Sequence, residues 1–142
     1  MSELLYAAYF WASLVAQGVG EWLKAAEHME AAGTLVKKMR NRRTIRHVAA
    51  GRARLFLLLG DLAPVVRWVA ETETARKERA PILAPINEYE DLTLVQAYLT
   101  LGRVEDGLIL LDQLQPVVEA AGRYDHVYRI IALRALALAA LG

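Results

Sequence analysis

The chain has 142 residues, of which 56% are hydrophobic, and its 17 basic and 16 acidic side chains leave a net charge of +1. This length suits one domain, and the near-neutral balance provides no global field that would favour nucleic acid or a membrane surface. The absence of cysteine excludes both a disulfide framework and a thiolate metal site.

Seven helices are predicted, arranged in antiparallel pairs. In chain order they cover residues 3–17, 21–40, 43–59, 62–73, 87–101, 104–121 and 126–141. Pro81 and Pro85 make residues 74–86 a long connector. Asn41 is predicted to end the second helix in the left-handed conformation. Asn87 and Glu90 have the spacing of a capping box at the start of the fifth helix.

Glycine recurs at a nearly constant interval along these helices. Gly18, Gly60, Gly102 and Gly142 are separated by 42, 42 and 40 residues, and the last three each follow a leucine. A fixed period in this range is typical of helical repeat arrays. We therefore predict one all-α solenoid domain over residues 1–142. Its repeat units are about 1–41, 42–86 and 87–125, with a half unit at 126–142, and it is excised from a longer protein.

The longest apolar stretch, residues 4–16, is too short for a bilayer-spanning helix, which needs about 20 residues. Glu3 is the only charge before it, so the stretch also lacks the basic segment of a signal peptide. These observations predict a buried first helix, no membrane association and a cytoplasmic protein. The last helix is apolar as well, and the two end helices are therefore candidates for self-association.

Counting back from the repeated glycines superimposes the first helix of each pair. Seven residues back is an apolar position, predicted to lie in the core: Trp11, Ala53, Val95 and Ala135. Positions thirteen, nine, six and two residues back form a second stripe on one helix face. In the middle units this stripe is largely polar or small, with His47, Gly51, Arg54, Tyr89, Thr93, Gln96 and Thr100, and in the last unit it holds Arg129 beside apolar residues. Such a stripe is either the solvated face of a solenoid or the wall of a binding groove.

No nucleotide-binding, metalloprotease, serine-hydrolase or calcium-binding motif occurs. The three histidines are far apart and lack a second ligand at a metal-binding spacing on the same helix. Glu88, Glu90 and Asp91 open a helix, where acidic side chains suit the helix dipole, so a capping role is favoured over catalysis. The sequence therefore predicts no enzyme, no metal and no cofactor.

Eight basic residues and no acidic residue lie between Ala31 and Gly60. This basic run lacks interleaved aromatic residues. It is therefore interpreted as a solvated surface, or as a contact with an acidic neighbouring domain, rather than as a nucleic-acid site.

Three stretches, ARLFLLLGDLAPVVRWV, INEYEDLTLVQAYLTLGRVEDGLILLDQL and VVEAAGRYDHVYRIIALRALALAALG, together resemble a known family. They are similar to the TPR-like helical-repeat region of MalT-like, LuxR-type ATP-dependent transcription regulators, signal-transducing ATPases of the STAND class. The resemblance implies a right-handed superhelix that lies between a nucleotide-binding unit and a DNA-binding unit. It does not carry ATPase activity or DNA binding over to these residues.

By this resemblance the chain is expected to be a non-catalytic sensor that binds a small-molecule inducer or a regulatory protein in its concave groove and contacts the flanking regulator domains. The expected groove residues are His47, Arg54, Tyr89, Thr93, Gln96, Thr100 and Arg129. One alternative is a self-standing TPR-type adaptor, in which His47, Arg54 and Arg129 would clamp a peptide. The other is a structural spacer within the regulator.

Overall fold

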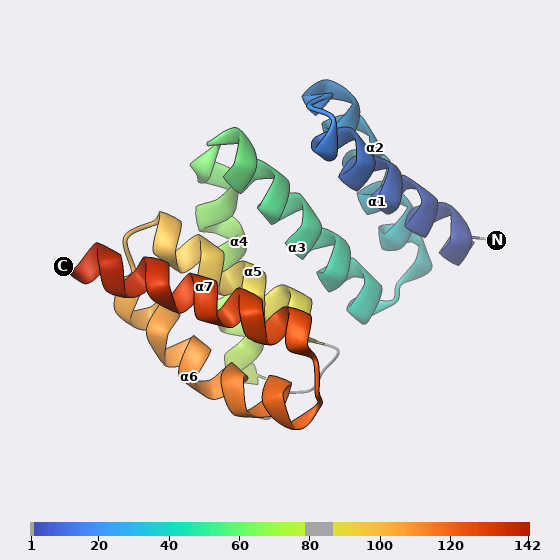
Figure 1. Cartoon of the computed structure of the whole chain (residues 1–142). Coiled ribbons are helices and arrows are strands. Elements are labelled where there is room, and N and C mark those ends of the chain that lie inside the picture. The colour runs from blue at the N-terminus through green and yellow to red at the C-terminus, as the bar shows by residue number, and fades with distance from the viewer. Residues whose placement is uncertain (1, 79–86) are drawn as a thin grey trace. The chain divides into compact units, whose positions relative to one another are not determined.

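The computed structural model describes residues 2–78 and 87–142, and every regular element in those ranges is a helix. The helices are α1 (Ser2–Gly18), α2 (Trp22–Met39), α3 (Arg42–Leu59), α4 (Leu62–Glu78), α5 (Glu88–Thr100), α6 (Val104–Ala120) and α7 (Tyr124–Leu141), as Figure 1 shows. The prediction of an all-α fold with seven helices is confirmed.

Most of the turns between helices share one backbone design, which explains the repeated glycine. Gly20, Gly60, Gly102 and Gly122 all have positive φ, between 70° and 80°. Each donates its N–H to the carbonyl three residues back, and the next residue donates to the carbonyl five residues back. This is the Schellman arrangement, in which a left-handed residue satisfies the last carbonyls of a helix. The following helix begins two residues after each glycine.

The turn between α2 and α3 also has a left-handed residue, but that residue is not glycine. Arg40 takes the left-handed conformation, with φ of 56°, so the prediction that Asn41 would do so is wrong. Asn41 is extended, and its side chain accepts a hydrogen bond of 3.2 Å from the N–H of Thr44. A short amide side chain suits this capping position. Gly33 does not interrupt α2.

Two other boundaries differ from prediction. The helix α4 continues to Glu78, because Thr74–Glu78 contains good helix formers although it lacks an apolar period. The rest of the predicted connector, residues 79–86, lies outside the described residues. Asn87 precedes α5 in the right-handed helical conformation, and its side chain makes no capping hydrogen bond, so the predicted capping box is not formed.

Contacts divide the chain into two compact units, Met1–Leu62 (unit 1) and Ala63–Gly142 (unit 2). In unit 1, α2 packs on both α1 and α3, and α1 lies along α2 over its length (Figure 1). Met29, Ala32 and Val36 of α2 are buried. Ser13 of α1 is also buried, and its hydroxyl donates a hydrogen bond of 2.7 Å to the carbonyl of Ala25.

In unit 2, α6 packs on both α5 and α7, and α5 also contacts α7. The helix α5 is the most buried element, because nine of its 13 residues are buried. Its apolar side chains Leu92, Leu94 and Val95 are almost completely covered, as is Leu111 of α6.

The predicted core position, seven residues before each repeated glycine, is only half correct. Ala53 and Val95 are buried, whereas Trp11 is 66% exposed and Ala135 is exposed. The structure explains Trp11, because Gly20 rather than Gly18 is the left-handed residue of the first turn. Counting from Gly20 puts the buried Ser13 at the core position.

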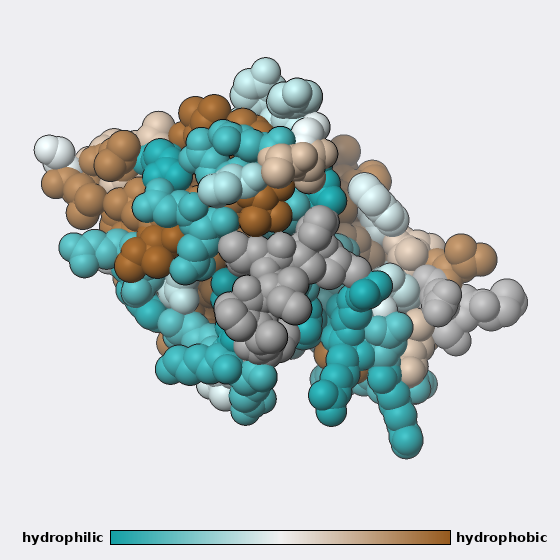
Figure 2. All heavy atoms as spheres, turned by 90° about the horizontal axis from the view of Figure 1, so that it is seen from below, coloured by the Kyte–Doolittle hydropathy of each residue, from teal (hydrophilic) through white to brown (hydrophobic). Residues whose placement is uncertain are grey.

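The expectation of a buried first helix is therefore wrong for one face of α1. Leu4, Trp11 and Val15 are all exposed there, and α7 exposes Tyr128, Ile131 and Leu138. Figure 2 shows one face of the molecule, on which brown hydrophobic side chains reach the surface among teal hydrophilic ones.

Candidate functional site

Two of the seven predicted site residues, His47 and Arg54, lie on α3 in unit 1. Both are half-buried, and the His47 and Phe10 ring centroids are 4.8 Å apart. Burial, with a smaller contribution from the positive charge of Arg54, lowers the pKa of His47 below its ordinary value of 6.5. The neutral imidazole is therefore favoured at pH 7, and the positive charge on this part of the stripe belongs to Arg54.

Gly51, which follows His47 by one helical turn on the predicted stripe, is a packing position rather than part of an open wall. It is buried, and a Cβ atom there would lie 2.9 Å from Cζ of Phe10 and closer still to Cε2. Glycine therefore lets the ring of Phe10 on α1 approach the backbone of α3. Gly51 is a small member of the predicted stripe, as expected, but its small size serves helix packing and it does not line an open groove.

The α5 part of the stripe holds four predicted residues with different exposure. Thr93 is fully buried, Tyr89 and Gln96 are half-buried, and Thr100 is exposed. The Thr93 hydroxyl donates to the carbonyl of Tyr89 at 2.7 Å, and the Thr100 hydroxyl donates to the carbonyl of Gln96 at 2.9 Å. Both threonine protons are thus used within the helix, which leaves hydroxyl oxygens and side-chain amides for any further contact.

Gln96 is half-buried in the middle of this stripe. Its side-chain oxygen is buried and accepts no hydrogen bond in the part of the chain that the structure describes. A hydrogen bond from a donor to a buried acceptor of this kind is energetically favourable. The remaining predicted residue, Arg129, is half-buried on α7, which contacts α5. Five of the seven predicted residues therefore belong to unit 2.

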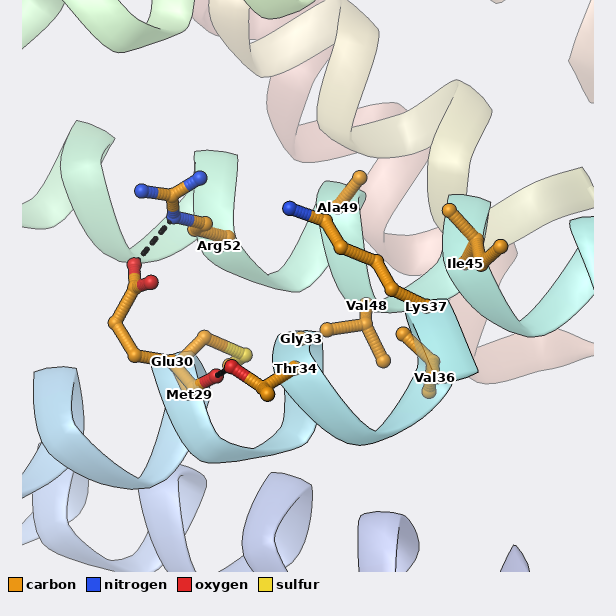
Figure 3. Close-up of a pocket in the computed structure, with 10 residues that line it drawn as sticks. All are labelled: Met29, Glu30, Gly33, Thr34, Val36, Lys37, Ile45, Val48, Ala49 and Arg52. Carbon is orange, nitrogen blue, oxygen red and sulfur yellow. Dashed lines mark hydrogen bonds and ion pairs between the residues drawn. The ribbon is translucent and has the colours of Figure 1, made fainter. Parts of the chain in front are cut away.

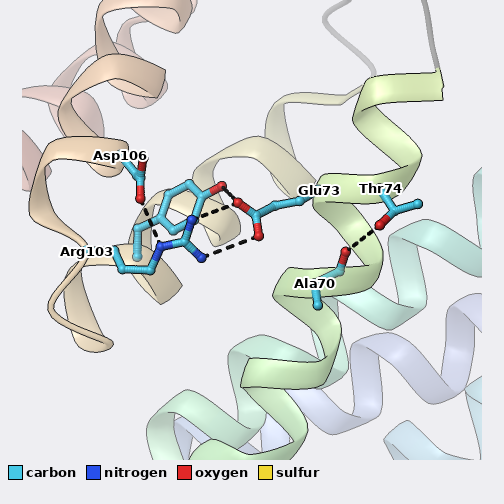
Figure 4. Close-up of polar contacts among 6 residues, drawn as sticks. Ala70, Glu73, Thr74, Arg103 and Asp106 are labelled. Carbon is cyan, nitrogen blue, oxygen red and sulfur yellow. Dashed lines mark hydrogen bonds and ion pairs between the residues drawn. The ribbon is translucent and has the colours of Figure 1, made fainter.

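A polar cluster that the sequence did not reveal joins α4, α5 and α6 in unit 2 (Figure 4). The guanidinium of Arg103 donates to both carboxylate oxygens of Glu73, at 2.8 and 3.3 Å, and its Nε donates to Asp106 at 2.9 Å. The Tyr98 hydroxyl donates to Glu73 at 2.9 Å, and the guanidinium lies 4.6 Å from the centre of the Tyr98 ring. Glu73 is 25 residues or more from Tyr98 and Arg103 in the sequence, so no local sequence motif predicts the cluster.

The electrostatics of this cluster favour its present protonation states. Hydrogen bonding to Arg103 lowers the pKa of Glu73, although burial opposes this effect. Burial, followed by the hydrogen bond to Glu73, raises the pKa of Tyr98 to about 12. Tyr98 stays neutral and Glu73 stays charged at pH 7, so the cluster serves as a structural tie between α4 and the turn that joins α5 to α6.

The acidic residues at the start of α5 also form specific pairs. Glu88 is buried, and one of its oxygens lies 2.6 Å from both the Arg123 guanidinium and Nδ1 of His126. Asp91, also buried, pairs with Arg76 of α4. The predicted capping role is therefore incomplete, because these carboxylates hold α5 to residues 15 to 38 positions away in the sequence.

No group of three or more potential metal-ligating side chains occurs in residues 2–78 and 87–142. No helix in the same ranges has the length and apolar character needed to cross a membrane.

Comparison with known proteins decides the family. The family model of the MalT-like TPR region matches residues 3–142. The chain belongs to this family. No curated protein and no solved structure matches the chain.

Membership of the MalT-like TPR region agrees with one feature of the helix geometry. Gly107 is the small residue expected in the second helix of a TPR pair, and a Cβ atom there would lie 3.0 Å from a Leu99 methyl group. The left-handed glycines Gly20, Gly60, Gly102 and Gly142 recur at intervals of 40, 42 and 40 residues, which is longer than the period of about 34 residues of a standard TPR. Helical repeats of this kind are protein-interaction folds that bind through extended surfaces.

Proposed function

We propose that the chain is a non-catalytic sensor or interaction module of a bacterial transcription regulator of the LuxR type. Membership of the MalT-like TPR family across residues 3–142 supports this proposal. In this proposal the polar stripe of α5, with Arg129 of α7, binds an inducer or a regulatory protein, and flanking regulator domains respond to it.

The choice of the α5 stripe as the binding site rests on the Gln96 side-chain oxygen, which accepts no hydrogen bond from the described residues. A ligand hydroxyl or amide that donates to this oxygen would satisfy a buried polar group that has no donor among the described residues. Thr100 is exposed one turn further along, and its hydroxyl oxygen still accepts hydrogen bonds. The site therefore favours ligands rich in donors, such as sugars.

The experiment is a thermal-shift screen of sugars, metabolites and acidic peptides, followed by calorimetric titration of each hit. We expect Gln96→Ala to weaken binding about three- to tenfold, as the loss of one hydrogen bond would do. Gln113→Ala, an exposed glutamine on α6, is the matched control and should bind as the parent does. If no compound raises the melting temperature, the structural-spacer alternative replaces this proposal. If only acidic peptides bind, and Arg129→Ala abolishes their binding, the adaptor alternative replaces it.

We also propose that the end helices self-associate head to tail, with α1 of one copy against α7 of the next. Both helices expose uncharged apolar stripes, of which Trp11 and Ile131 are members. Unit 1 carries nine basic and five acidic residues, and unit 2 carries eight and eleven, so unlike ends attract.

Mixing tests this arrangement. In light scattering, Trp11→Glu and Ile131→Glu should each be monomeric alone, and their equimolar mixture should form a dimer through the one intact surface of each. A monomeric parent protein, or a mixture that stays monomeric, would refute head-to-tail association.

A further inference from the structure

A small pocket opens between α2 and α3 in unit 1, about half a turn around α3 from His47 and Arg54. Its volume is about 100 Å³. Val36, Ile45 and Val48 form an apolar floor, and Lys37 and Arg52 lie at the rim. Figure 3 shows the Lys37 side chain extending from α2 toward α3, where Arg52 pairs with Glu30.

The pocket owes its space to Gly33, and helix packing does not explain this glycine. Glycine inside a helix is less stable than alanine by about 0.5–1 kcal/mol. At Gly51 and Gly107 a Cβ atom would collide with or press on a neighbour, so glycine is needed there. At Gly33 the nearest atom to a Cβ would be a Val48 methyl at 4.0 Å, an ordinary van der Waals distance. Gly33 therefore keeps a space open at a cost in helix stability.

At the rim, one positive charge has no partner among the described residues. The Nε atom of Arg52 lies 2.6 Å from a Glu30 carboxylate oxygen, so these two charges offset each other. Lys37 is exposed and forms no ion pair within the described residues. Among the residues that line the pocket, Lys37 and Arg52 are basic and Glu30 is acidic, so the lining carries a net positive charge.

We propose that this pocket binds a small aliphatic monocarboxylate. Its short alkyl chain would lie on the floor of Val36, Ile45 and Val48, and its carboxylate would lie between Lys37 and Arg52. An apolar cavity of 150 Å³ accepts benzene, so about 100 Å³ accommodates about four carbon atoms. One unpaired cation matches a single negative charge. The Glu30 carboxylate repels any anion, and this repulsion is greater for a doubly charged phosphate than for a monocarboxylate.

The test is an NMR titration of the whole chain with butyrate, in parallel with 1-butanol and with inorganic phosphate at equal ionic strength. We expect butyrate to shift the amide signals of Gly33, Thr34 and Ala49 saturably, with the millimolar affinity of so small a ligand. Butanol and phosphate should bind more weakly, because butanol lacks the negative charge and phosphate lacks the alkyl chain. Absence of saturable shifts with butyrate, or equal binding of butanol or phosphate, overturns the proposal.

Three variants separate this site from general charge attraction. Lys37→Gln should weaken butyrate binding about three- to fivefold, the effect of one partly exposed charge. Lys38→Gln, its exposed neighbour that does not line the pocket, should bind as the parent does. Gly33→Ala should fold, because its Cβ meets no close atom, and should bind less butyrate. Equal weakening by Lys37→Gln and Lys38→Gln would overturn the proposal. The α5 stripe shares no residue with the pocket, so Gln96→Ala should leave butyrate binding unchanged whatever becomes of the proposed function.

Discussion

Gly51→Ala and Gly33→Ala make the same chemical change in neighbouring helices of unit 1, yet they should have opposite effects on stability. At Gly51 the new methyl would lie 2.9 Å from Cζ of Phe10, whose ring is buried and rests against His47. Overpacking of this kind destabilises by about 1–3 kcal/mol, and the better helix propensity of alanine returns about 0.5–1 kcal/mol. The net expectation is a loss of about 1–2 kcal/mol.

At Gly33 only the propensity gain remains, because no atom lies within 4.0 Å of the new methyl except one of Val48 at that distance. Gly33→Ala should therefore stabilise by about 0.5–1 kcal/mol. Urea unfolding followed by circular dichroism gives both values from the shift of the midpoint at constant slope. The reasoning fails if Gly51→Ala is as stable as Gly33→Ala.

A double substitution identifies the clash as the cause. In Phe10→Leu the large ring is gone, so adding Gly51→Ala to this background should cost much less than it does in the parent. An unchanged cost would show that the loss comes from something other than contact between Phe10 and residue 51.

The remaining predictions concern charge. Because the pKa of Tyr98 is raised to about 12, its neutral phenol stabilises the fold below pH 10, and this contribution is lost as the pH rises through 12. Glu73→Gln should lower the pKa of Tyr98, measured by ultraviolet titration with Tyr98→Phe as the reference. An unchanged titration midpoint would contradict this prediction. Because the pKa of His47 is lowered, neutral His47 stabilises the fold above pH 6.5, and this contribution is lost as the pH falls through the lowered pKa. Arg54→Gln should raise the pKa of His47, which an NMR titration measures. A lower pKa of His47 in this variant would contradict the prediction. Glu88→Gln should lower the free energy of unfolding by about 1–2 kcal/mol in urea, because it removes the charge that faces Arg123 and His126. An unchanged free energy of unfolding would contradict a stabilising role for the Glu88 charge.

The helices were predictable from the sequence because the residues that end most of them are recognisable helix-terminating residues. Glycine followed by a polar residue marks the turns α1–α2, α3–α4, α5–α6 and α6–α7, and apolar side chains recur between them. The orientation of α1 was less accessible, since Gly18 and Gly20 are both suitable stops. Two residues rotate a helix by about 200°, which exchanges its buried and exposed faces. Trp11 is therefore exposed, against prediction, and Ser13 is buried in its place.

The candidate site was only partly predictable, for a different reason. A helical stripe can be counted along one helix, so Gln96 and Thr100 could be placed on one face of α5. Whether a stripe position is open depends on the neighbouring helix, and Gly51 meets Phe10 from α1. Ion pairs such as Arg103 with Glu73 join residues that are distant in the sequence, and no spacing rule links them.

The burial of α5 has a consequence on the timescale of hydrogen exchange. Nine of its 13 residues are covered, and Glu88 and Asp91 tie its first turn to other elements. Its amides can exchange only through the larger opening events of unit 2, whereas α1 and α7 each have a face open to solvent. Amide protection should therefore rise from the end helices toward α5, which would be the last helix of its unit to open.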